Sequence, residues 1–365
     1  MGEAGWLYTE LKQSTGTHFA LCWKGRLRYT VPRDATARKV CWKTFLPGWL
    51  ELPLRVMARL PRVFGAISCV EAKRLRLIRE AIGTETGLSC CRSGAPGPWS
   101  KDTILLLNRT NAEPLYVVKA GDGDAVDFLL RNEANWLRTL RDQPALADHI
   151  PELIADYTGM DSRFIAQRAL TGKLDYNFGE PHIAFLRKLH EYSRQPMRFE
   201  ESRLFSSMRS RMKDLDGLLS EEWAHRLEKT MLRIEQQFSD AAIVLVAAHN
   251  DFTPWNIRVE LGIARIFDWE LADYEQLPLF DALHFVAMPM ALKGASTSAI
   301  ITAMHKTQER CEHWFDVELC FKAQMQTLTY LMNLATLYLC AERGRSDSNL
   351  VMHIYGQCID YLGCV

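Results

Sequence analysis

The sequence predicts an α+β fold, with a small antiparallel sheet in an N-terminal lobe and mainly helices in a C-terminal lobe. Apolar segments at residues 103–107 and 115–119 flank a polar turn, which is the pattern of a β-hairpin. Apolar side chains recur at helical spacing in three later segments: residues 297–315, 318–342 and 350–361. The chain of 365 residues is long enough for two lobes with a full core.

The bulk composition excludes several classes of protein. The formal net charge is zero, so we expect no nucleic acid partner. The ten cysteines form no Cys-x-x-Cys pair, no apolar run has the length of a membrane span, and the N-terminus lacks the pattern of a signal peptide. We therefore expect reduced thiols and a cytoplasmic protein, either free or at the inner face of a membrane.

Residues 1–80 differ from the rest of the chain in charge and aromatic content. They carry 15 lysines and arginines against 6 acidic residues, a net charge of +9, so the remainder carries −9. Four of the ten tryptophans lie here: Trp6, Trp23, Trp42 and Trp49. Residues 18–23 and 27–31 are expected to be strands. Three interpretations stay open: an accessory subdomain that packs its aromatic side chains on the lobes, a basic surface in peripheral contact with an anionic membrane, or a partner-binding surface.

A lysine and a glutamate are expected to form a buried pair in the N-terminal lobe. Lys119 shares one face of the strand at 115–119 with apolar side chains, so it should be desolvated and should need an anion. Glu133 falls within the apolar stripe of a helix expected at 125–140. The alternative is that Lys119 reaches water and that Glu133 lies on the rim of its helix.

The stretch His249–Asn256 carries the strongest functional signal. An apolar run at 243–247 predicts a buried strand leading into it, and a hairpin is expected to follow, with its turn at Leu261–Gly262. If the hairpin turns near Gly262, strand pairing would set Asn256 opposite Asp268 and close to Asp251. Oxygen ligands grouped in this way suit Mg²⁺. The alternative is that these side chains only cap turns.

The order His249-x-Asp251-x-x-x-x-Asn256, followed by Asp268, resembles the aminoglycoside phosphotransferase and choline kinase-like family, which has a protein kinase-like fold. The resemblance covers roughly residues 90 to 345. It implies a two-lobed organisation with an extra N-terminal segment at 1–80, an N-lobe at 81–166 and a C-lobe at 167–365.

The resemblance also implies roles for the residues of this stretch. Asp251 would accept or orient the proton of an acceptor hydroxyl, and His249 is placed in the catalytic set as the residue that orders the loop. Asn256 and Asp268 would hold Mg²⁺. Asn250 stands where the family commonly has glycine, and asparagine tolerates the left-handed backbone that glycine would allow.

For the nucleotide, ATP or GTP, the resemblance implies contacts in the N-lobe and at its end. Lys119, paired with Glu133, would contact the phosphates. The segment Gln167, Arg168, Ala169 and Leu170 would join the lobes and contact the adenine edge through its backbone. A loop with Gly94 and Gly97 is a candidate for covering the phosphates, although such a loop is as easily an ordinary surface turn.

Two further carboxylates have expected supporting roles. Asp281 would buttress the catalytic loop and also suits a helix N-cap. Glu270 is a candidate for contact with the acceptor or for support of the neighbouring site residues. With Asp273 and Glu275 it forms an acidic cluster that suits a cationic acceptor or is simply solvated.

We therefore expect a Mg²⁺-dependent kinase that transfers the γ-phosphate of a nucleotide to a hydroxyl of a sugar-like, aminoglycoside-like or amino-alcohol acceptor. Two alternatives from other classes are a nucleotide-binding scaffold without activity and a membrane-peripheral assembly protein that works through residues 1–80. The acceptor, the choice of ATP or GTP and the oligomeric state do not follow from the sequence.

Overall fold

In the computed structural model the chain forms two compact units. The first unit combines the described parts of residues 1–138 and 151–170, and the second combines those of 139–150 and 171–365. The residues that the structure describes are 18–23, 26–32, 34–45, 66–67, 73–83, 86–94, 99–159, 163–238, 242–311, 323–341, 343–344 and 349–364.

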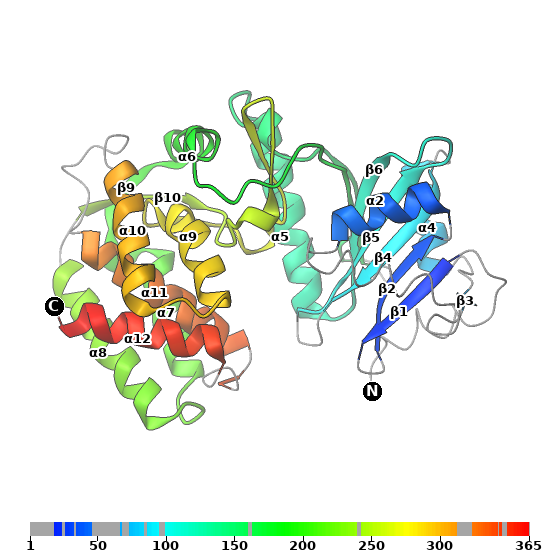
Figure 1. The fold of residues 1–365 in the computed structure, drawn as a ribbon. Helices are drawn as coiled ribbons and strands as arrows, with labels where there is room; N and C mark the ends of the chain where they lie inside the picture. Colours follow the sequence, from blue (N-terminus) through cyan, green and yellow to red (C-terminus); the bar gives the residue numbers. More distant parts are fainter. Residues whose placement is uncertain are drawn as a thin grey trace. The chain divides into compact units, whose positions relative to one another are not determined.

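An eight-stranded antiparallel sheet forms the body of the first unit (Figure 1). The strand order is β3-β1-β2-β4-β5-β6-β8-β7. Its strands are β1 (His18–Trp23), β2 (Arg26–Pro32), β3 (Ala66–Ile67), β4 (Thr86–Ser93), β5 (Asp102–Asn108), β6 (Pro114–Ala120), β7 (Leu153–Asp156) and β8 (Phe164–Arg168). The predicted hairpins at 18–31 and 103–119 are therefore present as β1–β2 and β5–β6.

Both faces of the central strands are buried by helices. The helices of this unit are α2 (Ala35–Phe45), α4 (Lys73–Ile82) and α5 (Asp124–Arg141). On β5, Leu106 packs in one apolar cluster with Ile78 of α4, whereas Leu105 packs in another with Cys41 of α2. Because successive strand side chains point to opposite faces, burial on both sides explains the continuous apolar run of β5.

Strands of the expected N-terminal segment belong to the same sheet as the strands that follow residue 80. Strand β2 pairs with β4, so β1 and β2 extend the same sheet as the expected N-lobe. The physical reason is that β4 offers an open edge, which β2 completes. The side chains of the four N-terminal tryptophans and nearly all of residues 50–68 lie outside the described residues, so the surface hypotheses for this segment stay predictions. Among the described residues, no helix is both long and apolar enough to span a membrane.

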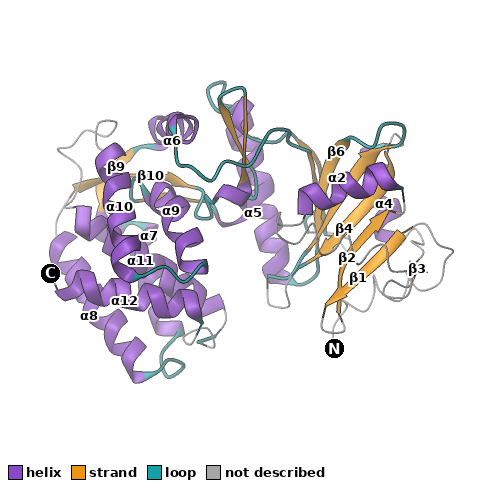
Figure 2. Ribbon diagram, viewed as in Figure 1, coloured by secondary structure: helices purple, strands orange, loops and turns teal. Residues whose placement is uncertain are grey.

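The second unit is mainly helical, as the secondary structure in Figure 2 shows. Its helices are α6 (Glu180–Ser193), α7 (Arg203–Asp214), α8 (Glu221–Phe238), α9 (Phe280–Leu292), α10 (Thr297–Cys311), α11 (Ala323–Ala341) and α12 (Leu350–Cys364). Helix α11 is apolar on most sides because it packs against α7, α8, α9 and α12. The three predicted C-terminal helices are thus present, and the α+β prediction is confirmed.

Two small sheets in this unit position the loop at His249–Asn256. Strand β10 (Ala242–Ala248) lies between β9 (Gln195–Arg198) and β13 (Asp273–Gln276) in an antiparallel sheet. Strands β11 (Ile257–Glu260) and β12 (Ile263–Ile266) form a hairpin whose turn residues, Leu261 and Gly262, both have positive φ angles. That conformation is typical of a two-residue hairpin turn.

Candidate active site

The loop between β10 and β11 is held by a buried carboxylate. Asp281 is 1% exposed, and its two oxygens accept hydrogen bonds from the backbone N–H groups of His249 (2.7 Å) and Asn250 (2.9 Å). Burial raises the pKa of the Asp281 carboxyl above its usual value, while these hydrogen bonds act in the opposite direction. Asp281 is the second residue of α9 and not its N-cap, which is Leu279, so the N-cap part of the prediction is wrong. The side chain turns to the loop instead of its own helix.

Asn250 has the left-handed backbone that the sequence led us to expect. Its φ angle is 62°, and its side-chain Nδ2 donates a hydrogen bond to the carbonyl of Leu271 (3.0 Å). Asparagine adopts this conformation more readily than most residues other than glycine. The loop can therefore turn sharply between His249 and Asp251 without glycine.

Both ring nitrogens of His249 are used within the loop. Nδ1 accepts a hydrogen bond from the backbone N–H of Asp251 (3.2 Å), and Nε2 lies 3.0 Å from the carbonyl oxygen of Phe267, to which it must donate. An imidazole with one accepting and one donating nitrogen is neutral. His249 is also fully buried, so its geometry suits a residue that orders the loop and not one that transfers protons.

Asp251 and Asn256 lie in direct contact. The side-chain Nδ2 of Asn256 donates two hydrogen bonds to Asp251. One reaches its backbone carbonyl oxygen (3.0 Å) and the other its carboxylate Oδ2 (2.8 Å). The backbone N–H of Phe267 donates to the Asn256 carbonyl (3.1 Å), and Ile257 pairs with Ile266. Asn256 therefore stands opposite Phe267, one residue from the register that we predicted, because the turn is centred between Leu261 and Gly262 and not at Gly262.

The donor set at this loop fits a hard divalent cation. Since Nδ2 of Asn256 is directed at Asp251, its Oδ1 is left as the ligand atom of the amide. Asp268 follows Phe267 directly and has a φ angle of 74°, a left-handed conformation that is uncommon outside glycine and that clusters at functional sites. A carboxylate and an amide oxygen are ligands that Mg²⁺ accepts.

The acidic residues after Asp268 have different surroundings. Asp273 forms an ion pair with Arg203 (3.0 Å), and Glu275 accepts a hydrogen bond from the backbone N–H of Arg203 (2.6 Å) at the start of α7. Burial raises the pKa of the Asp273 carboxyl. Asp273 and Glu275 of the predicted acidic cluster therefore have structural partners. Glu270 is half-buried on the short 3₁₀ helix Trp269–Leu271.

In the first unit, the predicted pair of Lys119 and Glu133 is present. The Lys119 ammonium lies 2.5 Å and 2.6 Å from the two carboxylate oxygens of Glu133. The side chains are 4% and 0% exposed, respectively. A charge buried to this degree is stable only with a partner of this kind, so β6 and α5 are joined by a buried ion pair.

The segment Gln167–Leu170 leaves β8 at the end of the first unit. The backbone N–H groups of Arg168 and Ala169 donate to the carbonyls of Glu152 and Leu115, so they are already used. The side-chain Oε1 of Gln167 is buried and has no hydrogen-bond partner among the described residues. The prediction of a nucleotide contact here therefore depends on Gln167 and on the remaining backbone groups.

The glycine loop is only partly described. Residues 95–98, including Gly97, lie outside the described residues. At Gly94 a Cβ atom would lie 2.6 Å from the backbone oxygen of Lys101, so only glycine fits at this point of the β4–β5 hairpin.

Sequence reasoning did not identify His284. Its Nε2 lies 3.3 Å from Oδ1 of Asp251. The available signal was its spacing: His284 follows Asp281 by three residues, so both side chains lie on one face of α9.

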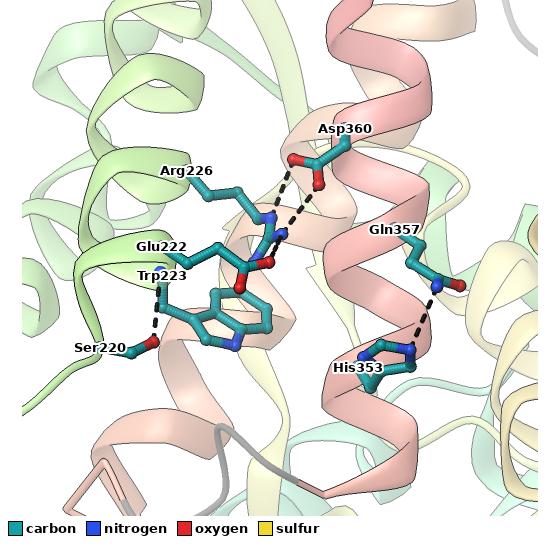
Figure 3. Close-up of a pocket in the computed structure, with 7 residues that line it drawn as sticks. All are labelled: Ser220, Glu222, Trp223, Arg226, His353, Gln357 and Asp360. Carbon is teal, nitrogen blue, oxygen red and sulfur yellow. Dashed lines mark hydrogen bonds and ion pairs between the residues drawn. The ribbon is translucent and has the colours of Figure 1, made fainter.

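A separate polar pocket of about 330 Å³ is formed by residues of α8, α12 and the chain just before α8 (Figure 3). Arg226 points from α8 to Asp360 of α12, with both Arg226–Asp360 hydrogen bonds at 2.8 Å. Arg226 also pairs with Glu222. Its guanidinium is thus neutralised by two carboxylates, which indicates a structural link between the helices.

Comparisons with solved structures agree with this fold. A candidate fructosamine-3-kinase from Thermobifida fusca is 18% identical, with a TM-score of 0.53 over 80% of this chain and 99% of that one. A thermostable mutant of the aminoglycoside phosphotransferase APH(4)-Ia, in complex with AMP-PNP and hygromycin B, is 10% identical, with a TM-score of 0.54 over 81% and 98%. At these identities the likeness shows the fold, and the kinase-like prediction is confirmed.

A search of curated proteins returned no match. The model of the phosphotransferase enzyme family, abbreviated APH, matches residues 94–311, which is more than half of the chain and includes the loop and hairpin described above. The chain therefore belongs to the phosphotransferase enzyme family.

Proposed function

We propose that this phosphotransferase transfers the γ-phosphate of ATP to a hydroxyl group of a small polar molecule, with Mg²⁺ as cofactor. The observation that carries the proposal is the contact between Asp251 Oδ2 and Asn256 Nδ2 (2.8 Å) on a loop that Asp281 holds by two backbone hydrogen bonds. A carboxylate fixed beside an amide that can offer its oxygen to a metal is an arrangement suited to phosphoryl transfer.

In this proposal Asp251 orients the acceptor hydroxyl and accepts its proton. Its side chain is 27% exposed, so a hydroxyl can approach it. Lys119, held by Glu133, contacts the nucleotide phosphates, and Gln167 offers its Oε1 as an acceptor to the base. Asn256 and Asp268 would hold Mg²⁺, which supplies charge neutralisation to the phosphates. His249 and Asp281 keep the loop in place.

The proposed acceptor is inferred from structures with the same fold and from the acidic residues that follow Asp268. Structures with the same fold hold ADP or AMP-PNP together with hygromycin B, which supports a nucleotide and a polar polyhydroxy acceptor. Asp273 and Glu275 contact Arg203, and Glu270, two residues after Asp268, is proposed to contact an amino group on the acceptor. We propose a sugar-like, aminoglycoside-like or amino-alcohol compound.

The experiment compares wild type with Asp251→Asn, Asp268→Asn and a control, Asp148→Asn, which changes an exposed carboxylate of the same unit. Each protein is incubated with Mg²⁺·ATP and a panel of sugars, aminoglycosides and amino alcohols. ATP consumption and the mass of the phosphorylated product are measured. We expect Asp251→Asn to lower kcat by about 10²- to 10⁴-fold while nucleotide still binds.

Asp268→Asn should weaken the dependence on Mg²⁺ and lower activity, and Asp148→Asn should behave like wild type. A wild type that binds Mg²⁺·ATP and phosphorylates no member of the panel would favour the scaffold over the kinase. Equal turnover by wild type and Asp251→Asn would overturn the role of Asp251.

A further inference from the structure

His284 reaches the catalytic loop from the first turns of α9. It is 1% exposed, and its Nε2 lies 3.3 Å from Oδ1 of Asp251. Asp281, one turn earlier on the same helix, holds the backbone of the loop. The two side chains of α9 therefore act on different parts of one loop, Asp281 on its backbone and His284 on its reactive side chain.

The contacts of His284 define the position of its proton. An ionised carboxylate can only accept a hydrogen bond, so Nε2 of His284 must carry the hydrogen that points to Asp251. Its Nδ1 lies 2.9 Å from the hydroxyl of Tyr330 on α11. A neutral imidazole then accepts a hydrogen bond from the Tyr330 hydroxyl at Nδ1. Burial raises the pKa of Tyr330 well above its usual value, so its hydroxyl keeps the hydrogen that it donates.

The carboxylate of Asp251 is thereby restrained at both oxygens. Asn256 donates to Oδ2 (2.8 Å) and His284 donates to Oδ1 (3.3 Å). Each carboxylate oxygen has two lone pairs, so the two hydrogen bonds leave acceptor capacity for a substrate hydroxyl. With only one restraint the carboxylate could rotate about its χ2 angle, which is a soft torsion.

We propose that His284 is a positioning residue, which holds the Asp251 carboxylate through its Nε2–H in the orientation that accepts the proton of the acceptor hydroxyl. This inference rests on the proposed function. Tyr330 fixes the imidazole ring and its tautomer from the opposite side. A chain of hydrogen bonds runs from the Tyr330 hydroxyl through the His284 imidazole to Asp251, and it joins α11, α9 and the catalytic loop.

The test uses substitutions that separate the hydrogen bond from packing. His284→Leu removes the donor, His284→Gln keeps a side-chain N–H that can reach Asp251, and Tyr330→Phe removes only the hydroxyl. The control is Thr329→Val, which removes a buried hydrogen bond to the Met325 carbonyl within α11 next to Tyr330. Full-length proteins are compared with Mg²⁺·ATP and the acceptor panel, and kcat and KM are determined separately.

We expect His284→Leu to lower kcat on the order of 10- to 100-fold with KM for ATP unchanged, because a misplaced group costs rate and not nucleotide binding. His284→Gln should recover most of the wild-type kcat. The kcat of Tyr330→Phe should lie between those of His284→Leu and wild type, and Thr329→Val should match wild type. Recovery by glutamine separates positioning from packing, since a purely structural histidine would not need an N–H donor.

A second measurement does not depend on activity. In ¹⁵N-histidine-labelled protein, the NMR signals of the His284 ring should show the neutral tautomer with hydrogen on Nε2. The same signal should shift in Asp251→Asn. Hydrogen on Nδ1 alone would overturn the inference.

The outcomes distinguish the two proposals. If wild type and Asp251→Asn are both inactive, the proposed function fails and the inference fails with it. If wild type is active and Asp251→Asn is not, while His284→Leu keeps the full kcat, only the inference is overturned.

Discussion

The buried pair of Lys119 and Glu133 makes a stability prediction that a double-mutant cycle can measure. Glu133→Leu leaves a lysine ammonium that is 4% exposed, and Lys119→Met leaves a carboxylate that is 0% exposed. Leaving one charge buried without its partner costs about 3–5 kcal/mol. The double variant Lys119→Met/Glu133→Leu has no charge at this place and should lie within about 1 kcal/mol of wild type. It should therefore be more stable than either single variant.

The free energy of unfolding is measured by urea titration for the four proteins, followed by circular dichroism. The matched control is Glu152→Gln, which breaks an ion pair in the same unit between Glu152 and Arg168, with 45% and 52% exposed side chains and a distance of 2.9 Å. Exposed pairs of this kind contribute about 0–1 kcal/mol. The contrast between the two pairs isolates the effect of burial from that of distance.

The same double variant separates stability from function. It should fold, and it should fail to bind Mg²⁺·ATP with wild-type affinity because Lys119 is absent. The reasoning is refuted if the double variant loses as much stability as the two single variants together, since the loss would then come from packing and not from an isolated buried charge.

Three further predictions concern the second unit. Asp281→Asn places an amide N–H₂ group against a backbone N–H of the loop, so kcat should fall by about 10-fold or more in steady-state assays, with KM for ATP unchanged; an unchanged kcat would contradict this. Burial lowers the pKa of His190 to about 3, so between pH 6.5 and about 3 only the unfolded chain takes up this proton. This one group should therefore lower the free energy of unfolding by about 1.4 kcal/mol per pH unit on acidification. In urea titrations at several pH values, His190→Leu should show a shallower dependence of that free energy on pH than wild type. Asp360→Asn weakens the pairing of Arg226, which is 8% exposed, and should cost about 1–3 kcal/mol in urea titrations. Glu222→Gln, at a 77% exposed carboxylate, should cost less than about 1 kcal/mol, and equal losses would contradict the argument.

Those features of the fold that depend on local patterns could be predicted from the sequence. The hairpin at β5–β6 follows from two apolar runs around a polar turn, and α5 follows from its apolar stripe. The pairing of Lys119 with Glu133 follows from one further step, because each charge lies on an apolar face where it needs a partner. In each case the information lies within one or two neighbouring elements.

Features that depend on contacts between distant elements could not be predicted in this way. The pairing of β2 with β4 has no local signal, since any strand of suitable length can complete an open edge. The contact of His284 with Asp251 joins residues 33 positions apart, and it depends on how α9 packs beside the loop. The register error at Asn256 has a smaller cause: moving the turn by half a residue moves every pair by one.

The loop and hairpin from His249 to Asp268 combine backbone strain with hydrogen-bond support. Asn250 and Asp268 both have left-handed backbones, with φ angles of 62° and 74°, and such conformations cost on the order of 1–3 kcal/mol for residues other than glycine. At Asn250 the surrounding hydrogen bonds offset this cost, since Asp281 accepts from its backbone N–H and its own side chain donates to Leu271. Glycine would relieve the strain but would lose the second of these bonds. The asparagine therefore links the loop to Leu271, in the turn that follows Asp268, through a hydrogen bond that a glycine would not supply.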